Sequence, residues 1–299
     1  MRQDNQHDPT LAHGPRTLIP IGGNEAKATN SVIFDEMTHR AGGKAARIVI
    51  VPTASATPEE RGRDYERLFR TFEPTSIDVL TVLERPDASK AKILAPLREA
   101  TLVMFSGGDQ LRLSSLLGGT PLHHLLMERY GDGCIVAGTS AGAAVLPEAM
   151  IFQNNGFRLY RKGGLEMTMG LGLIRNVIFD THFVSRSRIS RLVHAVATNP
   201  SLLGFGLEEN TALVIEDEER GYAIGAGTVI VVDGREAEIN TIASTENRAP
   251  FAITNLRYSV LTHGVSIDLD RRQIRQLPRA DHLGAKGNSR APLAKERAT

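Results

Sequence analysis

Short apolar runs, rich in β-branched residues, recur through the first two thirds of the chain and alternate with stretches of helical periodicity. We expect strands at 17–21, 47–51, 77–82, 101–105, 134–137 and 177–179, and helices at 30–40, 59–72, 88–95, 109–117, 121–130 and 187–197. Strands and helices that alternate in this way are typical of an α/β fold, in which a mostly parallel sheet carries helices on both faces.

The pattern changes after Pro200. Three apolar stretches at 212–215, 222–224 and 228–232 are separated by turn residues rather than by helices. Such spacing predicts an antiparallel hairpin at an edge of the sheet. We therefore expect one catalytic domain at 16–270, which follows a disordered N-terminal arm at 1–15.

The C-terminal end is strongly basic, although the net charge of the whole chain is only +1. From residue 271 on, eight Lys and Arg stand against two Asp and Glu, so this segment carries +6 and the rest of the chain −5. Its Ala, Gly and Arg offer little apolar surface to bury, which predicts a disordered tail at 271–299. We interpret it as a solvated end and expect no nucleic-acid partner.

The single cysteine, Cys134, excludes a disulfide framework and is typical of a reducing compartment. The polar first residues lack the apolar core of a secretory signal. No apolar run approaches the roughly 18–20 residues needed to cross a bilayer. We therefore expect a cytoplasmic protein with no membrane partner.

The early strands end in glycine and small polar residues, and one of these ends carries a nucleophile motif. Gly138-Thr139-Ser140-Ala141-Gly142 follows an apolar strand and matches the pattern G-x-S-x-G. A strand that turns sharply into a helix projects the middle serine at the helix N-terminus, where backbone N–H groups can hold an oxyanion. This predicts Ser140 as a nucleophile, whereas the alternative is a serine that only caps the helix. Cys134 precedes the turn by six residues, so we expect it to be buried and not catalytic.

A serine nucleophile needs a base and an acid. Of the nine histidines, His182 alone follows a predicted strand directly, at the carboxyl end where ligands of α/β sheets bind. Glu208 and Glu209 follow another apolar run at 202–205, and the residues alone leave open which carboxylate orients the imidazole. The order Ser, His, Glu differs from that of α/β-hydrolases, in which the acid precedes the histidine. This order disfavours an esterase or a lipase.

A second oxyanion donor has to come from a neighbouring loop. Gly107 and Gly108 follow the strand at 101–105, and two glycines permit close approach of the backbone to a ligand. We expect their N–H groups to act together with that of Ala141. Neither this loop nor the glycine-rich loop at 22–27 matches the phosphate-binding pattern G-x-x-x-x-G-K-[ST]. The metal-binding pattern H-E-x-x-H does not occur. We therefore expect no cofactor and no metal.

Three arginines follow His182 within nine residues, at positions 186, 188 and 191. Guanidinium groups bind carboxylates through two parallel hydrogen bonds, so this cluster suits recognition of a carboxylate on the substrate. The alternative is a solvated basic helix face. Their place beside the predicted base favours substrate binding.

Four motifs, taken in order, resemble the cyanophycinases, which are serine peptidases related to the α-aspartyl dipeptidase called peptidase E. The motifs are 107–110, 138–143, 180–183 with the three arginines, and 204–211, and the resemblance runs from about residue 17 to 234. It implies a fold similar to class I glutamine amidotransferases and a homodimer. The implied reaction is hydrolysis of cyanophycin, a poly-aspartate with arginine on each β-carboxylate, to β-aspartyl-arginine dipeptides.

The resemblance also assigns residues. It implies Ser140 as the nucleophile, His182 as the base and Glu209 as the acid. The substrate-contacting positions that it implies are Gln110, Asp180, Thr181, Arg186, Arg188 and Arg191. One of them departs from the family, because cyanophycinases often have glutamine where this chain has Thr181. An aspartyl or isoaspartyl dipeptidase of the same family is therefore one alternative, and a non-catalytic binding module on the same scaffold is another.

Overall fold

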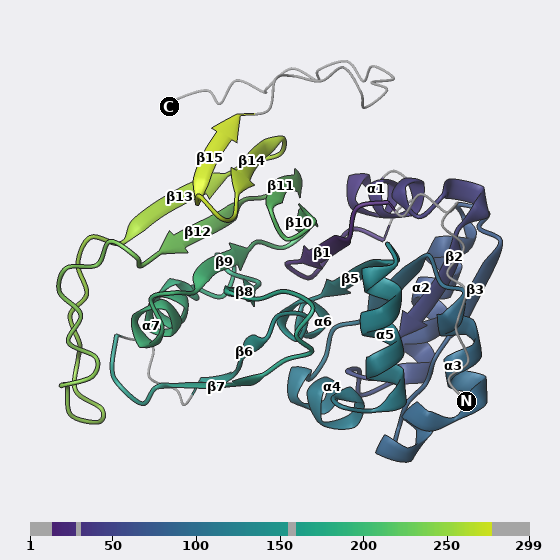
Figure 1. The fold of residues 1–299 in the computed structure, drawn as a ribbon, viewed down its shortest axis with the longest axis horizontal. Helices are drawn as coiled ribbons and strands as arrows, with labels where there is room; N and C mark the ends of the chain where they lie inside the picture. The colour runs from purple at the N-terminus through teal and green to yellow at the C-terminus, as the bar shows by residue number, and fades with distance from the viewer. Residues whose placement is uncertain (1–13, 28–30, 155–159, 277–299) are drawn as a thin grey trace, which may run out of the picture.

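The computed structural model describes residues 14–27, 31–154 and 160–276. Within these residues the largest sheet has nine strands in the order β15-β14-β11-β10-β1-β5-β4-β2-β3 (Figure 1). The strands from β1 to β3 in this order are parallel, and the others pair antiparallel. Their bounds are β1 Thr17–Ile21, β2 Arg47–Val51, β3 Ser76–Val79, β4 Leu102–Phe105, β5 Ile135–Thr139, β10 Thr211–Glu216, β11 Arg220–Gly225, β14 Val265–Asp268 and β15 Gln273–Gln276.

Helices cover both faces of the parallel half of this sheet. Ile19 and Ile21 of β1 share an apolar cluster with Phe34 and Phe69 of α1 and α2, whereas Leu18 faces the other way, towards α3, α4 and α5. Because successive side chains of a strand point to opposite faces, a strand covered on both sides is apolar throughout. The helices are α1 Val32–Arg40, α2 Pro58–Arg70, α3 Ala91–Arg98, α4 Gln110–Leu117, α5 Pro121–Gly131, α6 Ala141–Ala144 and α7 Ile189–Thr198, with 3-10 turns at Gly43–Ala45 and Arg85–Ser89.

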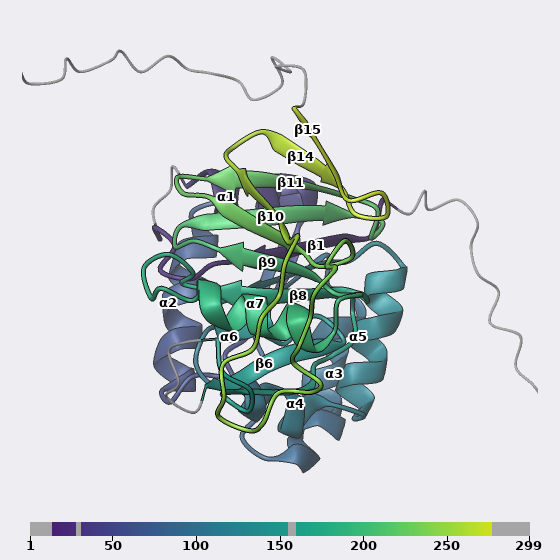
Figure 2. The ribbon, with the colours of Figure 1, turned by 90° about the vertical axis from the view of Figure 1, so that its left-hand side faces the viewer.

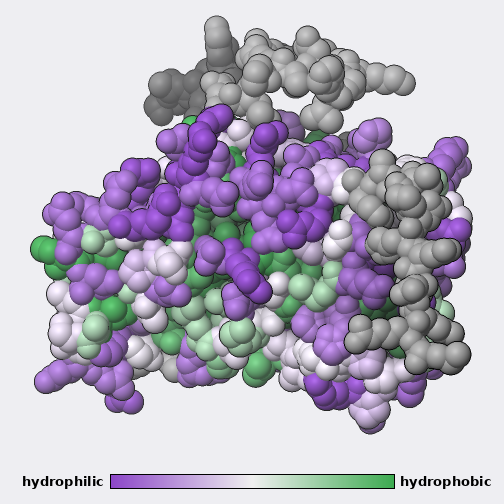
Figure 3. Space-filling model, in the orientation of Figure 1, coloured by the Kyte–Doolittle hydropathy of each residue, from purple (hydrophilic) through white to green (hydrophobic). Residues whose placement is uncertain are grey.

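A second sheet, in the order β13-β12-β9-β8, packs on the face of the large sheet that also carries α3, α4 and α5. Phe179 of β8 and Phe205 of β9 lie in one apolar cluster with Leu213 and Ile215 of β10. Helix α7 covers the outer face of the second sheet (Figure 2). The remaining strands are β6 Ala149–Asn154, β7 Leu165–Met169, β8 Val177–Thr181, β9 Leu203–Leu207, β12 Val229–Asp233 and β13 Arg257–Leu261. The view in Figure 3 shows a mainly hydrophilic surface over these layers, with hydrophobic residues visible mostly towards its middle.

The predicted fold class is confirmed, but two strands lie elsewhere than expected. The strand predicted at 177–179 is β8 of the second sheet, where it pairs in parallel with β9. The predicted hairpin is present as β10 and β11, but its third stretch leaves the large sheet as β12. The chain turns away at Gly225, which has φ of 111°. This position requires glycine, because a Cβ there would lie 2.3 Å from the Asn210 carbonyl oxygen. The hairpin is not the edge either, because β14 and β15 extend the sheet beyond it.

The start of the basic tail needs a correction. Residues 273–276 form β15, which pairs with β14. Arg272 is only 9% exposed and forms an ion pair of 2.5 Å with Asp233. A run of basic residues looks solvated in sequence, yet here one guanidinium is neutralised by a carboxylate far away in the chain. The folded region therefore extends to residue 276, and the remaining residues of the predicted tail, like residues 1–13 of the predicted arm, lie outside the described residues. None of the helices within the described ranges is both long and apolar enough to span a bilayer.

Candidate active site

The carboxyl ends of β1, β5, β8 and β9 meet where the two sheets pack together. Ser140 follows β5, His182 follows β8, and Glu209 comes two residues after β9. The loop after β1 runs between them. Four strand ends from two sheets thus bring together three side chains that are up to 69 residues apart in sequence.

Ser140 occupies a strained turn between β5 and α6, with φ of 53° and ψ of −112°. Non-glycine residues in such conformations cost about 1–3 kcal/mol each and persist only where their surroundings fix them. The turn leaves no room for a side chain at Gly142, where a Cβ would lie 2.5 Å from the Phe105 carbonyl oxygen. The small residues of the predicted elbow are therefore a packing requirement.

Ser140, His182 and Glu209 form one hydrogen-bonded chain. Ser140 Oγ lies 2.9 Å from His182 Nε2, and His182 Nδ1 lies 2.7 Å from Glu209 Oε1. Hydrogen bonds from His182 and then from Asn24 hold the pKa of the Glu209 carboxyl below its usual range. The carboxylate thus stays ionised and can favour the imidazole tautomer that has its proton on Nδ1 and a free Nε2 facing the serine.

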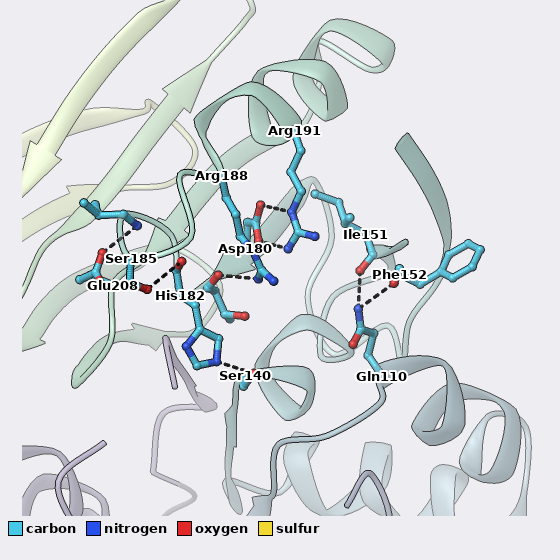
Figure 4. A network of polar contacts seen from close by, with 12 residues as sticks. Gln110, Ser140, Ile151, Phe152, Asp180, His182, Ser185, Arg188, Arg191 and Glu208 are labelled. Atoms are coloured by element: carbon cyan, nitrogen blue, oxygen red, sulfur yellow. Dashed lines mark hydrogen bonds and ion pairs between the residues drawn. The ribbon is translucent and has the colours of Figure 1, made fainter. Parts of the chain in front are cut away.

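The neighbouring carboxylate, Glu208, has a different set of contacts. Its Oε2 accepts a hydrogen bond of 2.7 Å from the Val184 N–H (Figure 4). Its Oε1 accepts one of 3.0 Å from the Glu209 N–H. Glu208 therefore ties the turn after His182 to the turn that carries Glu209. The geometry separates two adjacent acids that the sequence could not distinguish.

The loop after β1 contacts all three members of this chain, and sequence reasoning gave it no such role. The carbonyl oxygens of Ile21 and Gly22 accept hydrogen bonds from the N–H groups of Ser140 (3.0 Å) and His182 (2.8 Å). Asn24 Nδ2 donates to Glu209 Oε2 over 3.0 Å. The only signal was a pair of glycines at a strand end, which marks a close approach: a Cβ on Gly23 would lie 2.4 Å from the His182 ring.

The predicted oxyanion donors border the serine. A Cβ built on Gly107 would lie 3.9 Å from Ser140 Oγ, so this loop passes directly beside the predicted nucleophile. Among the described residues, the N–H groups of Gly107, Gly108 and Ala141 find no acceptor. Free donors beside a serine are what a developing oxyanion requires.

The arginine cluster is organised by a buried acid. The Asp180 side chain is 0% exposed, and both of its oxygens accept hydrogen bonds from Arg191, one of them at 2.6 Å from Nε. Arg188 lies 3.4 Å from the same carboxylate and donates to the Thr181 carbonyl oxygen over 2.7 Å (Figure 4). Burial, and then the nearby charge of Arg191, lower the pKa of Arg188 to about 10.

Four of the implied substrate contacts differ in how free they are. Arg186 is exposed, and no described residue pairs with its side chain. Arg191, in contrast, is committed to Asp180, and the buried Asp180 holds arginines rather than facing solvent. Thr181 is also buried, at the end of β8.

Gln110 begins α4, which Asp109 caps by accepting from the Leu111 N–H over 2.8 Å. The Gln110 amide donates to the carbonyl oxygens of Ile151 (3.0 Å) and Phe152 (3.2 Å), which fastens α4 to β6. In Figure 4 it lies on the side of Ser140 away from His182. Its NH₂ group is thus occupied, and its carbonyl oxygen is the atom left to meet a substrate.

Comparison with known proteins adds to this geometry. Residues 18–238 match the model of peptidase family S51. The chain belongs to that family. As an S51 peptidase it is a hydrolase, and the serine type fits both the family and the arrangement around Ser140.

Curated relatives of this S51 peptidase are named cyanophycinase. The protein from Synechococcus elongatus is 37% identical over 258 residues, covering 86% of this chain and 80% of the relative. That from Geminocystis herdmanii is 36% identical over 249 residues, covering 83% and 92%. Among solved structures, a peptidase from an acI-B1 Actinobacterium is 25% identical with a TM-score of 0.64, covering 86% of this chain and 98% of the other.

Cysteine and metal chemistry each require groups that can be looked for in this S51 peptidase. Cys134 is buried at 2% exposure, as predicted, and burial raises the pKa of its thiol to about 12, so the thiolate needed for cysteine catalysis is disfavoured. Within the described part of the chain, no group of three or more His, Cys, Asp and Glu side chains could hold a metal ion.

Proposed function

We propose that this S51 peptidase degrades cyanophycin to β-aspartyl-arginine dipeptides, with Ser140 as nucleophile, His182 as general base and Glu209 as the acid that orients it. The observation that carries the proposal is the hydrogen-bonded chain from Ser140 to Glu209 in a family member whose curated relatives are cyanophycinases. The arginine cluster beside it supports a substrate that carries carboxylates.

The reaction follows from the positions of these groups. Ser140 Oγ attacks the carbonyl carbon of the scissile bond while its proton passes to His182 Nε2. Ionised Glu209 stabilises the imidazolium that forms. The negative charge on the carbonyl oxygen is met by the N–H groups of Ala141 and of the Gly107–Gly108 loop. His182 then protonates the leaving amine, and a water molecule, deprotonated by the same imidazole, releases the acyl group from the serine.

Substrate binding falls mainly to Arg186 and Arg188 in this proposal. Together with Arg191 and Asp180 the cluster carries three positive charges and one negative charge, so its net charge of about +2 attracts carboxylates. Arg191 and Asp180 act indirectly, since each neutralises and aligns the other. Gln110 would border the substrate from the opposite side through its free amide oxygen.

One observation favours a second candidate function, an aspartyl or isoaspartyl dipeptidase. The buried threonine at position 181 replaces a polar amide that cyanophycinases often have there. A lost amide contact would weaken selection for a long substrate without altering the catalytic groups.

Parallel digestion distinguishes the two candidates. The purified protein is incubated with cyanophycin and, separately, with α-aspartyl and isoaspartyl dipeptides, and the products are identified by mass spectrometry. We expect β-aspartyl-arginine from cyanophycin and little cleavage of dipeptides. Cleavage of the dipeptides alone would replace the proposal with the second candidate.

We also propose that the protein is a homodimer. The family resemblance implies it, and β13 supports it, because this strand is an edge of the four-stranded sheet among the described residues and exposes more than half of both Tyr258 and Val260. Unpaired apolar edges favour association. Light scattering during size exclusion should give twice the 32.5 kDa of one chain, and the double variant Tyr258→Lys, Val260→Glu should give a monomer. A monomeric wild type would refute this assembly.

A further inference from the structure

A buried carboxylate lies directly behind the nucleophile turn, on the loop that follows β1. Glu25 is 5% exposed and belongs to none of the groups assigned to the reaction. Its Oε2 accepts a hydrogen bond of 2.6 Å from Thr139 Oγ1, and its Oε1 accepts one of 2.5 Å from the Tyr65 hydroxyl. Lys27 Nζ lies 3.3 Å from the same Oε1 and also 5.0 Å from the centre of the Tyr65 ring.

These contacts make the Glu25 carboxyl group a hydrogen-bond acceptor. Burial, and then the charge of Glu25, raise the pKa of Tyr65 well above its usual value, so the phenol keeps its proton and donates it. The Thr139 hydroxyl donates to the other oxygen. A carboxylate that accepts from two hydroxyls and faces an ammonium group is satisfied as an anion. Glu25 is therefore a buried acceptor on both of its oxygens, with Lys27 as the cation beside it.

Such a group is expensive to bury. An ionised carboxylate loses its hydration on folding, and well-packed apolar residues in its place are often as stable or more so. Stability alone is thus a poor reason for this arrangement. Its position suggests another reason, because the residue that it holds, Thr139, comes immediately before Ser140.

The turn at Ser140 has to be fixed from outside. Its φ of 53° is an unfavourable value that persists only where neighbouring groups over-determine it. The Thr139 side chain is the last group of β5 before this turn, and Glu25 anchors it to the loop after β1. The same loop holds the backbone of His182 and the carboxylate of Glu209.

We propose that Glu25 is a positioning residue: by holding the Thr139 hydroxyl, it locks the turn that presents Ser140 Oγ to His182 Nε2. This inference rests on the proposed role of Ser140. It makes the loop after β1 a single platform that sets the nucleophile through Glu25, the base through Gly22 and the acid through Asn24. A nucleophile displaced by 1 Å can lose about a hundredfold in rate, so a small loosening of the turn has a large effect.

The test uses two variants of the pair and two controls. Glu25→Gln keeps the shape but turns an NH₂ group towards one of the two hydroxyl donors. Thr139→Val keeps the branched volume and removes the hydroxyl, which leaves a β-branched residue well suited to a strand. Thr139→Ser is the first control, because it keeps the hydroxyl and removes only the methyl group. Asp233→Asn is the matched control, because Asp233 is also 5% exposed and paired with a cation, but lies at the far end of β12.

The first readout is the rate at which a serine-directed phosphonate labels Ser140, which needs no natural substrate. We expect Glu25→Gln and Thr139→Val to be labelled about ten- to a hundredfold more slowly than wild type, and Thr139→Ser to retain most of the rate. Asp233→Asn should have a lower melting temperature than wild type but should be labelled at the wild-type rate. With a cleaved substrate, the loss should fall on kcat and leave KM within about twofold, as for an interaction made in the transition state.

Two results would overturn the inference. Labelling of Thr139→Val at the wild-type rate would show that the hydroxyl anchor does not set the nucleophile. A loss in Asp233→Asn as large as in Glu25→Gln would show a general effect of weakened folding. Failure of the proposed function looks different, since wild type itself would then resist labelling, or Ser140→Ala would still be labelled.

Discussion

Backbone φ angles are positive, between 46° and 53°, at four non-glycine residues that carry or adjoin the active-site groups, namely Asn24, Ser140, His182 and Asn210. Each costs energy that must come from the surrounding contacts. The hydrogen bonds from the loop after β1 to Ser140, His182 and Glu209 supply such contacts. At the scale of single residues, strain in the backbone is what aims the side chains of Ser140 and His182 at one another.

The first prediction at this scale concerns the nucleophile. Ser140→Ala should reduce turnover by up to about 10⁶-fold, as loss of the nucleophile does in one well-studied serine protease. Because the turn accommodates only small residues, alanine should preserve the melting temperature. His182→Ala should match the loss, whereas His39→Ala, on the exposed side of α1, should be silent. More than a few percent of activity in Ser140→Ala would reject this residue as the nucleophile.

The second prediction concerns the pKa of Glu209, which hydrogen bonds from His182 and Asn24 lower. Ionised Glu209 stabilises the folded chain at pH values above its pKa in the unfolded state, and this contribution is lost as the pH falls through the lowered folded pKa. Asn24→Ala removes one donor, so the pKa of Glu209 should rise, its contribution to stability should be smaller, and the loss of that contribution should be complete at a higher pH.

Carbon-13 NMR titration of the Glu209 carboxyl measures this pKa directly. Asn199→Ala is the control, since Asn199 caps the far end of α7 and contacts Ser201. The control should leave the Glu209 titration unchanged. Identical titrations in Asn24→Ala and wild type would mean that Asn24 does not stabilise the carboxylate.

At the scale of elements, the junction between β8 and α7 combines a structural ion pair with a free cation. Arg191 is 14% exposed and binds the fully buried Asp180, whereas Arg186 precedes the helix and is exposed. Neighbouring arginines in one motif therefore have different tasks. Replacing them one at a time should separate stability from substrate binding.

Arg191→Ala leaves a buried carboxylate with only Arg188 as partner. Breaking a buried pair costs about 3–5 kcal/mol, and we expect the low end because Arg188 remains. Arg186→Ala should change stability by less than about 0.5 kcal/mol but weaken binding of a carboxylate substrate roughly tenfold. Denaturant unfolding and KM measure the two effects. Equal stability losses in both variants would contradict this division.

The sequence predicts elements that have local signatures. The parallel strands, the elbow at Ser140 and the histidine at the end of β8 all follow from short patterns. Short patterns do not show which sheet a strand joins, since an apolar run such as 177–179 would have the same sequence pattern in either sheet. The short strands β13, β14 and β15 mix apolar with polar residues, so they have no such local signature.

The site shows the same limit. Glu208 and Glu209 differ only in the direction of their side chains, which no sequence pattern records. The contact of Asn24 with Glu209 joins residues 185 positions apart. The burial of Arg272 depends on Asp233, 39 positions away, so composition alone placed it in the tail. Each miss is a long-range pairing of charged or polar groups.

At the scale of the whole molecule, two sheets must stay packed for the site to exist, because Ser140 follows a strand of one and His182 a strand of the other. The C-terminal residues contribute to that packing as far as β15 and Arg272, which binds Asp233 of the second sheet. The cytoplasmic location stays a prediction that rests on the sequence.

Truncation tests where the folded region ends. Removing residues 277–299 should change the melting temperature by no more than about 2 °C, as expected for a change of a few tenths of a kcal/mol. Removing residues 271–299 deletes β15 and leaves Asp233 without its partner Arg272. This truncation should lower the melting temperature several times more than removal of residues 277–299 does. Equal melting temperatures for the two truncations would show that β15 contributes nothing.

The central claim is that Ser140 of this S51 peptidase cleaves cyanophycin. Mass spectrometry of the soluble products released from cyanophycin by wild type and by Ser140→Ala tests it most directly. We expect β-aspartyl-arginine dipeptides from wild type, in the presence or absence of a chelator, and none above background from Ser140→Ala. Release of the same dipeptides by Ser140→Ala, or no release by a folded wild type, would contradict it.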